Sequence, residues 1–175
     1  NTVKMSYRTT PNFKQIISSH NAKIMKGGNF DPPCNCQKKD SCPLNGKCRV
    51  NNLIYQATIT THQNPPQTET YVGMTSTEFK DRHRNHKKSF NHYTYKAETT
   101  LSQHIWRLKS KNIEFDEEWK ILDRARPFSP VTGVCSLCTL EHFHIISSPE
   151  EATLNKNEEI YKPCIHRKLF LLDKT

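Results

Sequence analysis

Two tyrosines, an arginine and a histidine are the first residues in this sequence whose types and spacing suggest chemistry: Tyr55, Tyr71, Arg82 and His86. Arg82 and His86 are four residues apart, so on a helix they share one face. A guanidinium matches phosphate oxygens in a planar fork, and an imidazole can carry a proton or grip a phosphate. With two tyrosine hydroxyls beside them, these side chains indicate phosphate chemistry.

The surrounding residues predict the elements that position this group. Leu53–Thr61 alternates and is rich in β-branched side chains, which predicts a strand. The polar, proline-containing stretch 62–67 predicts a turn, and 68–74 predicts a second strand, so a hairpin is expected. Residues 75–78, Thr-Ser-Thr-Glu, have the form of a capping box, which predicts that the helix carrying Arg82 starts there.

The order of these residues resembles that of the GIY-YIG nuclease family. Leu53-Ile54-Tyr55 stands at the first motif, with Leu53 in place of a glycine, and Tyr71-Val72-Gly73 stands at the second. Arg82 stands at the family's helix arginine. Over roughly residues 10–172 the chain resembles the endonuclease portion of Penelope-like retroelements. Four runs carry this wider resemblance: CNCQKKDSCPLNGKC, FKDRHRNHKKSF, CSLCTLEH and LNKNEE.

The resemblance implies a role for each site residue. In this family one glutamate holds a single divalent ion, Mg²⁺ or Mn²⁺, and by resemblance that glutamate is Glu141. Arg82 would pair with the scissile phosphate, while Tyr55 would position or deprotonate the attacking water. Tyr71 would hydrogen-bond to that water or to the phosphate, and Asn155 would brace the site. A tyrosine with an ordinary pKa of about 10 is a poor base at neutral pH, so the metal and the arginine would have to lower it.

Each of these residues also has a purely structural interpretation. A lone carboxylate on an otherwise apolar helix is costly to bury unless a cation meets it, but Glu141 could equally be exposed on an amphipathic helix. Arg82 could form a surface salt bridge with Asp81 or Glu78. Either tyrosine could be an amphipathic residue at a sheet edge.

Four cysteines fall close together before the predicted hairpin, in the pattern CxCx5Cx5C: Cys34, Cys36, Cys42 and Cys48. The residues between them are turn-formers in a hydrophilic segment, which suits four thiolates around one tetrahedral, structural Zn²⁺. The alternatives are buried cysteines or a disulfide pair. Seven cysteines without a secretory signal favour a reducing compartment and metal binding.

The remaining three cysteines and a histidine supply a second set of four ligands: Cys135, Cys138, Cys164 and His166. The wide separation of CxxC and CxH makes this pattern less specific, and a small hydrophobic cysteine cluster is the alternative. If zinc binds there, we expect it to hold the start of the helix that carries Glu141.

The composition favours a polyanionic partner. The chain has 175 residues with a formal charge of +9 and a pI near 9.2, and its apolar fraction is 34% with a mean hydropathy of −0.81. Such a charge is typical of a nucleic-acid-binding domain. Lys87, Lys88 and Lys96 lie among aromatics and are predicted to contact a DNA backbone, with a solvated helix end as the alternative. No run is long and apolar enough to predict a membrane span.

The remaining patterns complete an α/β fold, a small antiparallel three-stranded sheet flanked by helices with an N-terminal zinc knuckle. Helices are predicted at 12–25, 100–109 and 139–146, a third strand at 115–122, and a loop at 127–133. We expect Leu140, Phe143, Ile145 and Ile146 to make the last helix mostly buried. The predicted division is a connector over 1–30, a zinc knuckle over 31–50 and an endonuclease domain over 51–175.

Because Asn1 is not an initiator methionine, we expect the chain to be a piece of a longer polypeptide. The resemblance implies a nuclear, metal-dependent DNA endonuclease that leaves a 3′-hydroxyl to prime reverse transcription. Its partners would be DNA, the reverse transcriptase domain of the same polypeptide and the element RNA. The alternatives are a zinc-stabilised DNA-binding or RNA-binding module without hydrolysis.

Overall fold

The computed structural model describes residues 11–26, 32–126, 128, 132–156, 158, 164 and 166. Three antiparallel strands form one sheet in the order β2-β1-β3. The strands span β1 Leu53–Thr61, β2 Thr68–Thr75 and β3 Phe115–Arg124. The predicted hairpin and the predicted third strand are therefore confirmed, with β3 reaching two residues past its predicted end at 122.

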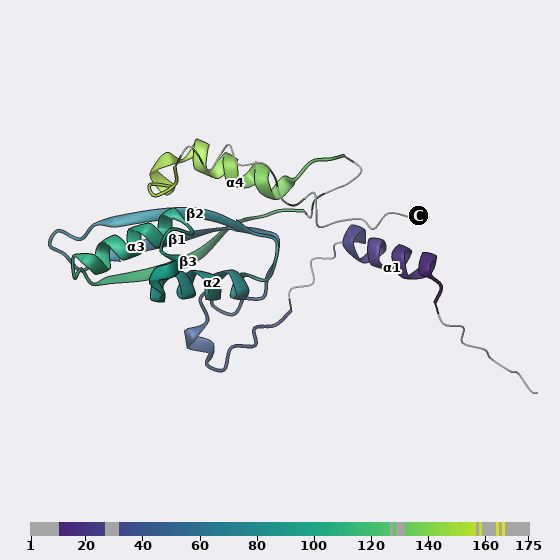
Figure 1. Cartoon of the computed structure of the whole chain (residues 1–175), viewed down its shortest axis with the longest axis horizontal. Coiled ribbons are helices and arrows are strands. Elements are labelled where there is room, and N and C mark those ends of the chain that lie inside the picture. Colours follow the sequence, from purple (N-terminus) through teal and green to yellow (C-terminus); the bar gives the residue numbers. More distant parts are fainter. Residues whose placement is uncertain are drawn as a thin grey trace, which may run out of the picture.

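Helices cover both faces of this sheet (Figure 1). Helices α2 Phe79–Asn91 and α3 Thr100–Ser110 lie on one face, and α4 Ser136–Ser147 lies on the other. The short 3₁₀ helix η2, Tyr93–Tyr95, connects α2 to α3, and η3, Pro149–Glu151, follows α4. The first helix, α1 Phe13–Lys26, precedes the cysteine segment, which contains η1, Lys39–Ser41.

The central strand β1 is buried on both faces because its side chains alternate between two cores. Tyr55, Ala57 and Ile59 belong to the core beneath α2 and α3. Ile54 belongs to the second core, beneath α4, together with Val72 of β2. This double burial explains why β1 is richer in apolar residues than a strand with one wet face.

The cysteine segment shares the first of these cores. Leu44 and Val50, which flank the last cysteines of this segment, are 6% and 2% exposed and pack in the same cluster as Phe79 and Leu101. The knuckle therefore continues directly into the packing that supports α2.

The predicted capping box is wrong, although a helix does start where it was expected. The residue before α2 is Glu78, whose side chain makes no capping hydrogen bond. Thr75 is instead the last residue of β2, and its hydroxyl oxygen accepts a hydrogen bond from the Thr77 N–H. The first amides of α2 donate to backbone carbonyls of the cysteine segment, so no side-chain cap is needed.

Helix α4 is also less buried than its sequence predicts. Leu137 and Ile145 are buried, but Phe143 and Ile146 are each 59% exposed. The helix begins at Ser136, before the predicted start at 139, and it lies over one face of the sheet (Figure 1). An apolar helix packed on a single layer cannot bury all of its faces, which is why the prediction of a mostly buried helix was wrong.

Candidate active site and metal centres

A hydrogen-bonded group of three side chains joins β1 to α2. The Tyr55 hydroxyl lies 2.7 Å from Nε2 of His86, and Nε of Arg82 donates to the same hydroxyl oxygen at 2.9 Å. Tyr55 is 0% exposed and His86 only 2%. The predicted face shared by Arg82 and His86 thus points at the β1 tyrosine.

Gly73 makes room for this group from the neighbouring strand. It pairs with Tyr55 across the β1–β2 ladder, and a Cβ atom added at Gly73 would lie 2.6 Å from the Tyr55 hydroxyl oxygen and 2.9 Å from a ring carbon of Tyr71. Such distances are far inside van der Waals contact, and any side chain here would displace one of the tyrosines. Because both tyrosine side chains approach the backbone of Gly73 so closely, only glycine fits at this position.

Within this group the arginine is charged and the histidine is neutral. Burial, followed by the charges of Arg82 and His83, lowers the pKa of His86 well below its ordinary value. The charge interaction with Tyr55, followed by those with Tyr71 and Glu141, raises the pKa of Arg82 despite its burial. His86 is therefore suited to accept the hydrogen bond of the Tyr55 hydroxyl, while that oxygen accepts from Arg82.

A cleft of about 390 Å³ opens beside this group, between α2, α4 and the end of β2. Five of the residues predicted from sequence line it: Tyr71, Arg82 and Glu141, together with the predicted zinc ligands Cys138 and His166. In the described part of the chain the Arg82 guanidinium donates one hydrogen bond, from Nε to Tyr55. Its two terminal nitrogens are thus available to a ligand in the cleft.

Tyr55 and His86 do not line the cleft, because they lie behind Arg82 and are fully covered. Asn155 does not line it either. Its side-chain amide pairs with the backbone of Val72, with Oδ1 accepting from the Val72 N–H and Nδ2 donating to the Val72 carbonyl, both at 2.8 Å. This two-point contact fixes the outer edge of β2, next to Tyr71.

Several further polar residues in the cleft were not foreseen from the sequence. Asn85 lies one helical turn after Arg82, and His142 directly follows Glu141, so spacing could have suggested both. Glu98 and Thr99 come from the segment before α3, and no local pattern points to them. The remaining polar residues of this kind are Thr75, Ser76 and Thr77.

The first cysteine cluster has the geometry of a zinc site. The ligand atoms of Cys34, Cys36, Cys42 and Cys48 all lie within 4.8 Å of one another. Cys48 Sγ is 3.7 Å from Cys36 Sγ and 3.5 Å from Cys34 Sγ. Tetrahedral zinc with Zn–S bonds of about 2.3 Å separates its sulfur ligands by about 3.8 Å. All four cysteines are free thiols, so the predicted cluster can hold zinc.

The turns between these ligands favour the thiolate form of one of them. Burial alone would raise the pKa of Cys42, but backbone N–H groups of Leu44 and Gly46 lower it to about 7. Gly46 donates to Cys42 Sγ at 3.1 Å. This amide is presented by a tight turn in which Asn45 and Gly46 have φ angles of 47° and 91°.

This first cluster also contacts the start of α2. The Lys80 N–H donates to the carbonyl of Cys48 at 2.7 Å, and the Phe79 N–H donates to the carbonyl of Val50 at 2.9 Å. Arg49 pairs with Glu78 at 3.1 Å. The knuckle therefore satisfies the unpaired first amides of the helix that carries Arg82.

The second predicted cluster also comes together. Cys135, Cys138, Cys164 and His166 place their ligand atoms within 4.8 Å of one another. The three sulfur atoms lie 3.4, 3.3 and 3.6 Å from Nδ1 of His166, close to the separation of about 3.6 Å expected for S and N ligands of tetrahedral zinc. Burial lowers the pKa of His166, which keeps the imidazole neutral and able to ligate.

The predicted DNA-contacting lysines lie outside the cleft. Lys87 forms an ion pair with Glu117, whose pKa is lowered to about 2 because His83 and Lys87 outweigh its burial. Lys88 lies 4.1 Å from the centre of the Tyr95 ring, and Lys96 lies 3.8 Å from that of Tyr93. Part of the basic surface is thus held on aromatic rings.

In comparisons with known proteins, no family model, no curated protein and no solved structure matches this chain. The resemblance to GIY-YIG nucleases therefore rests on the motifs in the sequence and stays a prediction. The structure shows a small antiparallel sheet with helices on both faces and two clusters able to hold zinc. Among the residues that are described, no helix has the length and apolar character to cross a membrane.

Proposed function

We propose that this chain is a metal-dependent DNA endonuclease that nicks its target and leaves a 3′-hydroxyl. The observation that carries the proposal is the position of Arg82, whose Nε is held by Tyr55 at 2.9 Å while the residue lines a cleft also lined by Glu141. A fixed guanidinium and a carboxylate that line the same open cleft suit a phosphodiester bound beside a cation.

In this proposal Arg82 contacts the scissile phosphate and stabilises the charge that develops on it. Tyr55 and His86 are positioning residues, because both are covered and act on the substrate only through the guanidinium that they orient. Tyr71 lines the cleft and is 5% exposed, which supports Tyr71 as the tyrosine that meets the attacking water or the phosphate.

Glu141 would hold a Mg²⁺ ion, or a Mn²⁺ ion, in the cleft, which Glu98 also lines. Mg²⁺ is commonly held by one or two carboxylates together with waters and substrate phosphate, so this sparse donor set fits that ion. When bound, the ion would supply activation of water and neutralisation of the leaving oxygen. Asn155 supports the same wall of the cleft by holding Val72.

The basic surface would bring the DNA to this cleft. With a charge of +9, binding should weaken steeply as salt rises, because each phosphate contact releases counterions. In the proposed retroelement, the 3′-hydroxyl would prime a reverse transcriptase domain of the same polypeptide on the element RNA, in the nucleus.

The test is nicking of supercoiled plasmid with added Mg²⁺ by the wild type and by Arg82→Ala. Because one preorganised charge stabiliser is lost, we expect Arg82→Ala to nick at least about a hundredfold more slowly. Its fold should survive, since the Tyr55 hydroxyl keeps its contact with His86. Arg84→Ala is the matched control, because Arg84 lies on the same helix and forms an exposed pair with Asp81.

A zinc-stabilised DNA-binding or RNA-binding module without hydrolysis is the second candidate. The complete burial of Tyr55 and His86 favours it, since such a pair also serves as core packing. Wild-type protein that binds plasmid tightly yet never nicks it with Mg²⁺ or Mn²⁺ would establish this module and exclude the nuclease. Equal nicking rates of Arg82→Ala and Arg84→Ala would show that Arg82 does not contact the scissile phosphate.

A further inference from the structure

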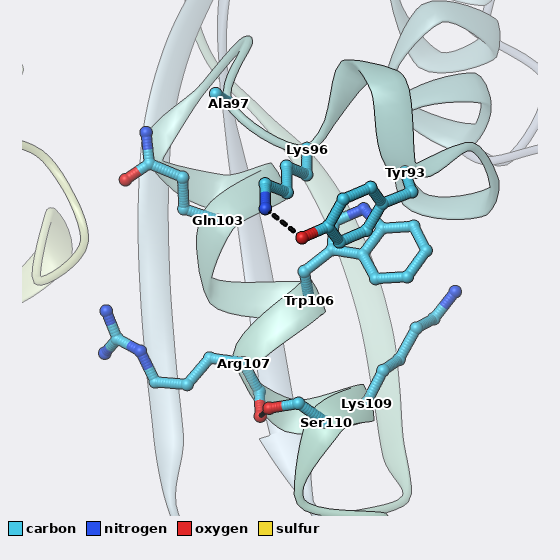
Figure 2. Close-up of a pocket in the computed structure, with 8 residues that line it drawn as sticks. All are labelled: Tyr93, Lys96, Ala97, Gln103, Trp106, Arg107, Lys109 and Ser110. Carbon is cyan, nitrogen blue, oxygen red and sulfur yellow. Dashed lines mark hydrogen bonds between the residues drawn. The ribbon is translucent and has the colours of Figure 1, made fainter.

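A second cavity lies on the outer surface of α3, away from both cysteine clusters and separate from the cleft that contains Arg82. It has a volume of about 660 Å³, within the roughly 300–1,000 Å³ typical of small-molecule sites. Figure 2 draws the eight residues that line it, which are Tyr93, Lys96, Ala97, Gln103, Trp106, Arg107, Lys109 and Ser110.

Two aromatic rings form one side of this cavity. The centroids of Tyr93 and Trp106 are 5.3 Å apart and their planes meet at 89°. Trp106 is fixed by a hydrogen bond from Nε1 to the carbonyl of Ser89 at 2.8 Å, whereas Tyr93 is 62% exposed. One ring is thus a rigid platform, and the other is a large aromatic surface left in water.

The remaining wall is basic. Lys96 reaches the Tyr93 hydroxyl (Figure 2) and lies 3.8 Å from the centre of that ring. Lys109 lies 5.2 Å from the centre of the Trp106 ring. Arg107 adds a third positive charge, and none of the eight lining residues is acidic.

We propose that this cavity, together with its rim, binds single-stranded nucleic acid. A base would stack on Tyr93, whose ring packs at a right angle against that of Trp106, and the phosphates on either side would meet Lys96, Arg107 and Lys109. Aromatic platforms inside a basic groove are the usual solution for unpaired strands, because every base offers a π-face and every nucleotide a negative charge. Bases in a duplex are already stacked and cannot reach such rings.

An ammonium on an exposed ring is held only weakly. A base that stacks on Tyr93 can therefore displace Lys96 toward a phosphate. Gln103, whose amide both donates and accepts, can hydrogen-bond the edge of the stacked base.

The location of the cavity suggests which strand would use it. Lys96 and Ala97 line this cavity, while Glu98 and Thr99, the next two residues, line the cleft that contains Arg82. The segment 96–99 therefore contributes to both spaces. An unpaired strand in the cavity would lie next to the cleft, as expected for a partly opened duplex. The binding itself does not depend on the proposed cleavage.

The test is binding of fluorescein-labelled oligothymidine and oligouridine of about 10 nucleotides, measured on the whole chain with its zinc and without added Mg²⁺. Because stacking of a base is lost, Tyr93→Ala should bind at least about fivefold more weakly. Arg107→Glu should also weaken binding and lower its salt dependence. Both side chains are exposed, so these variants should fold, which circular dichroism would verify.

Lys120→Glu is the matched control, because it makes the same kind of charge reversal on an exposed residue of β3, outside this cavity. We expect it to change the affinity less than about twofold, since solvent and salt screen a distant charge. A blunt duplex should bind Tyr93→Ala as well as it binds the wild type. Preference for oligothymidine or for oligouridine would identify DNA or RNA as the natural strand, and equal binding would support the shared chemistry.

Equal affinity of Tyr93→Ala and wild type for both oligonucleotides would overturn the proposal. Equal losses of affinity in Arg107→Glu and Lys120→Glu would also overturn it, because they would show that binding depends only on the overall charge of the protein. If the wild type fails to nick plasmid but Tyr93→Ala shows the predicted loss of oligonucleotide affinity, this inference is supported and the proposed nuclease activity is contradicted.

Discussion

Two cysteine clusters each meet the first turn of a helix that carries a residue of the candidate site, but they do so by different routes. The first supports α2 from outside, through carbonyls of Cys48 and Val50 that accept from its first amides. The second is part of α4 itself, because Cys135 is the cap of that helix and Cys138 lies in its first turn.

The two clusters also differ in how far apart their ligands lie in the sequence. Cys34 and Cys48 of the first are 14 residues apart, whereas Cys135 and His166 of the second are separated by 31. A metal in the first would fold a local segment that packs into the main core. A metal in the second would tie α4 to a distant stretch of chain. The first cluster is therefore expected to govern stability, and the second to govern the direction in which Glu141 points.

The largest effect should come from Cys48→Ser in the first cluster. Cys48 is 0% exposed, and Leu44 and Val50 beside it belong to the core beneath α2. Binding of structural zinc contributes about 10–16 kcal/mol in small zinc domains, so this variant should lose one equivalent of zinc and fail to fold. Metal analysis and thermal unfolding would measure both. A variant that lacks one zinc but unfolds at the wild-type temperature would show that the knuckle is not a structural support.

A smaller and more selective effect is expected from Cys164→Ser in the second cluster. The core beneath α2 and α3 does not involve this residue, so the protein should fold with one zinc fewer. Loss of an outer support to a metal ligand typically costs about 10–100-fold in activity, so nicking should fall by that factor while DNA binding changes little. Plasmid nicking and fluorescence anisotropy would separate the two.

Unchanged zinc content in Cys164→Ser would identify these residues as packing cysteines. A parallel loss of DNA binding and nicking would mean that the second cluster supports the whole domain, as the first is expected to do. Either result would contradict the proposed division of roles, in which the first cluster governs stability and the second governs the direction of Glu141.

The sequence predicted the elements that depend on local patterns. The alternation of Leu53–Thr61, the turn residues after it and the close spacing of the first four cysteines all report short-range structure, and the structure confirms the hairpin and brings those cysteines together. The four-residue spacing of Arg82 and His86 likewise placed both on the face toward β1.

What the sequence did not reveal depends on remote partners. The capping box failed because the amides of α2 are satisfied by Cys48 and Val50, some thirty residues earlier in the chain. Local spacing also gave no sign that Tyr55 is sealed behind Arg82, or that Glu98 lines the cleft. Each of these facts follows from how the sheet, the knuckle and α4 assemble, which no periodicity encodes.

The smallest effect should come from Arg49→Ala, which breaks the side-chain link between the knuckle and α2 without touching a ligand. Arg49 pairs with Glu78 through Nε and a terminal nitrogen, but both side chains are about one-third exposed, at 29% and 34%. Exposed pairs contribute little, so the midpoint of thermal unfolding should fall by no more than about 4 °C, with the zinc content unchanged.

Arg84→Ala is the control for this variant, because its pair with Asp81 lies within α2 and does not reach the knuckle. If backbone bonds from Lys80 and Phe79 hold the helix to the first cluster, both arginine variants should nick plasmid nearly as fast as the wild type. A loss of nicking in Arg49→Ala alone, at full zinc occupancy, would show that the ion pair and not the backbone contact fixes α2. The first cluster would then position Arg82 through the Arg49 side chain. Both clusters would in that case act on their helices through side chains, and the contrast between them would be smaller.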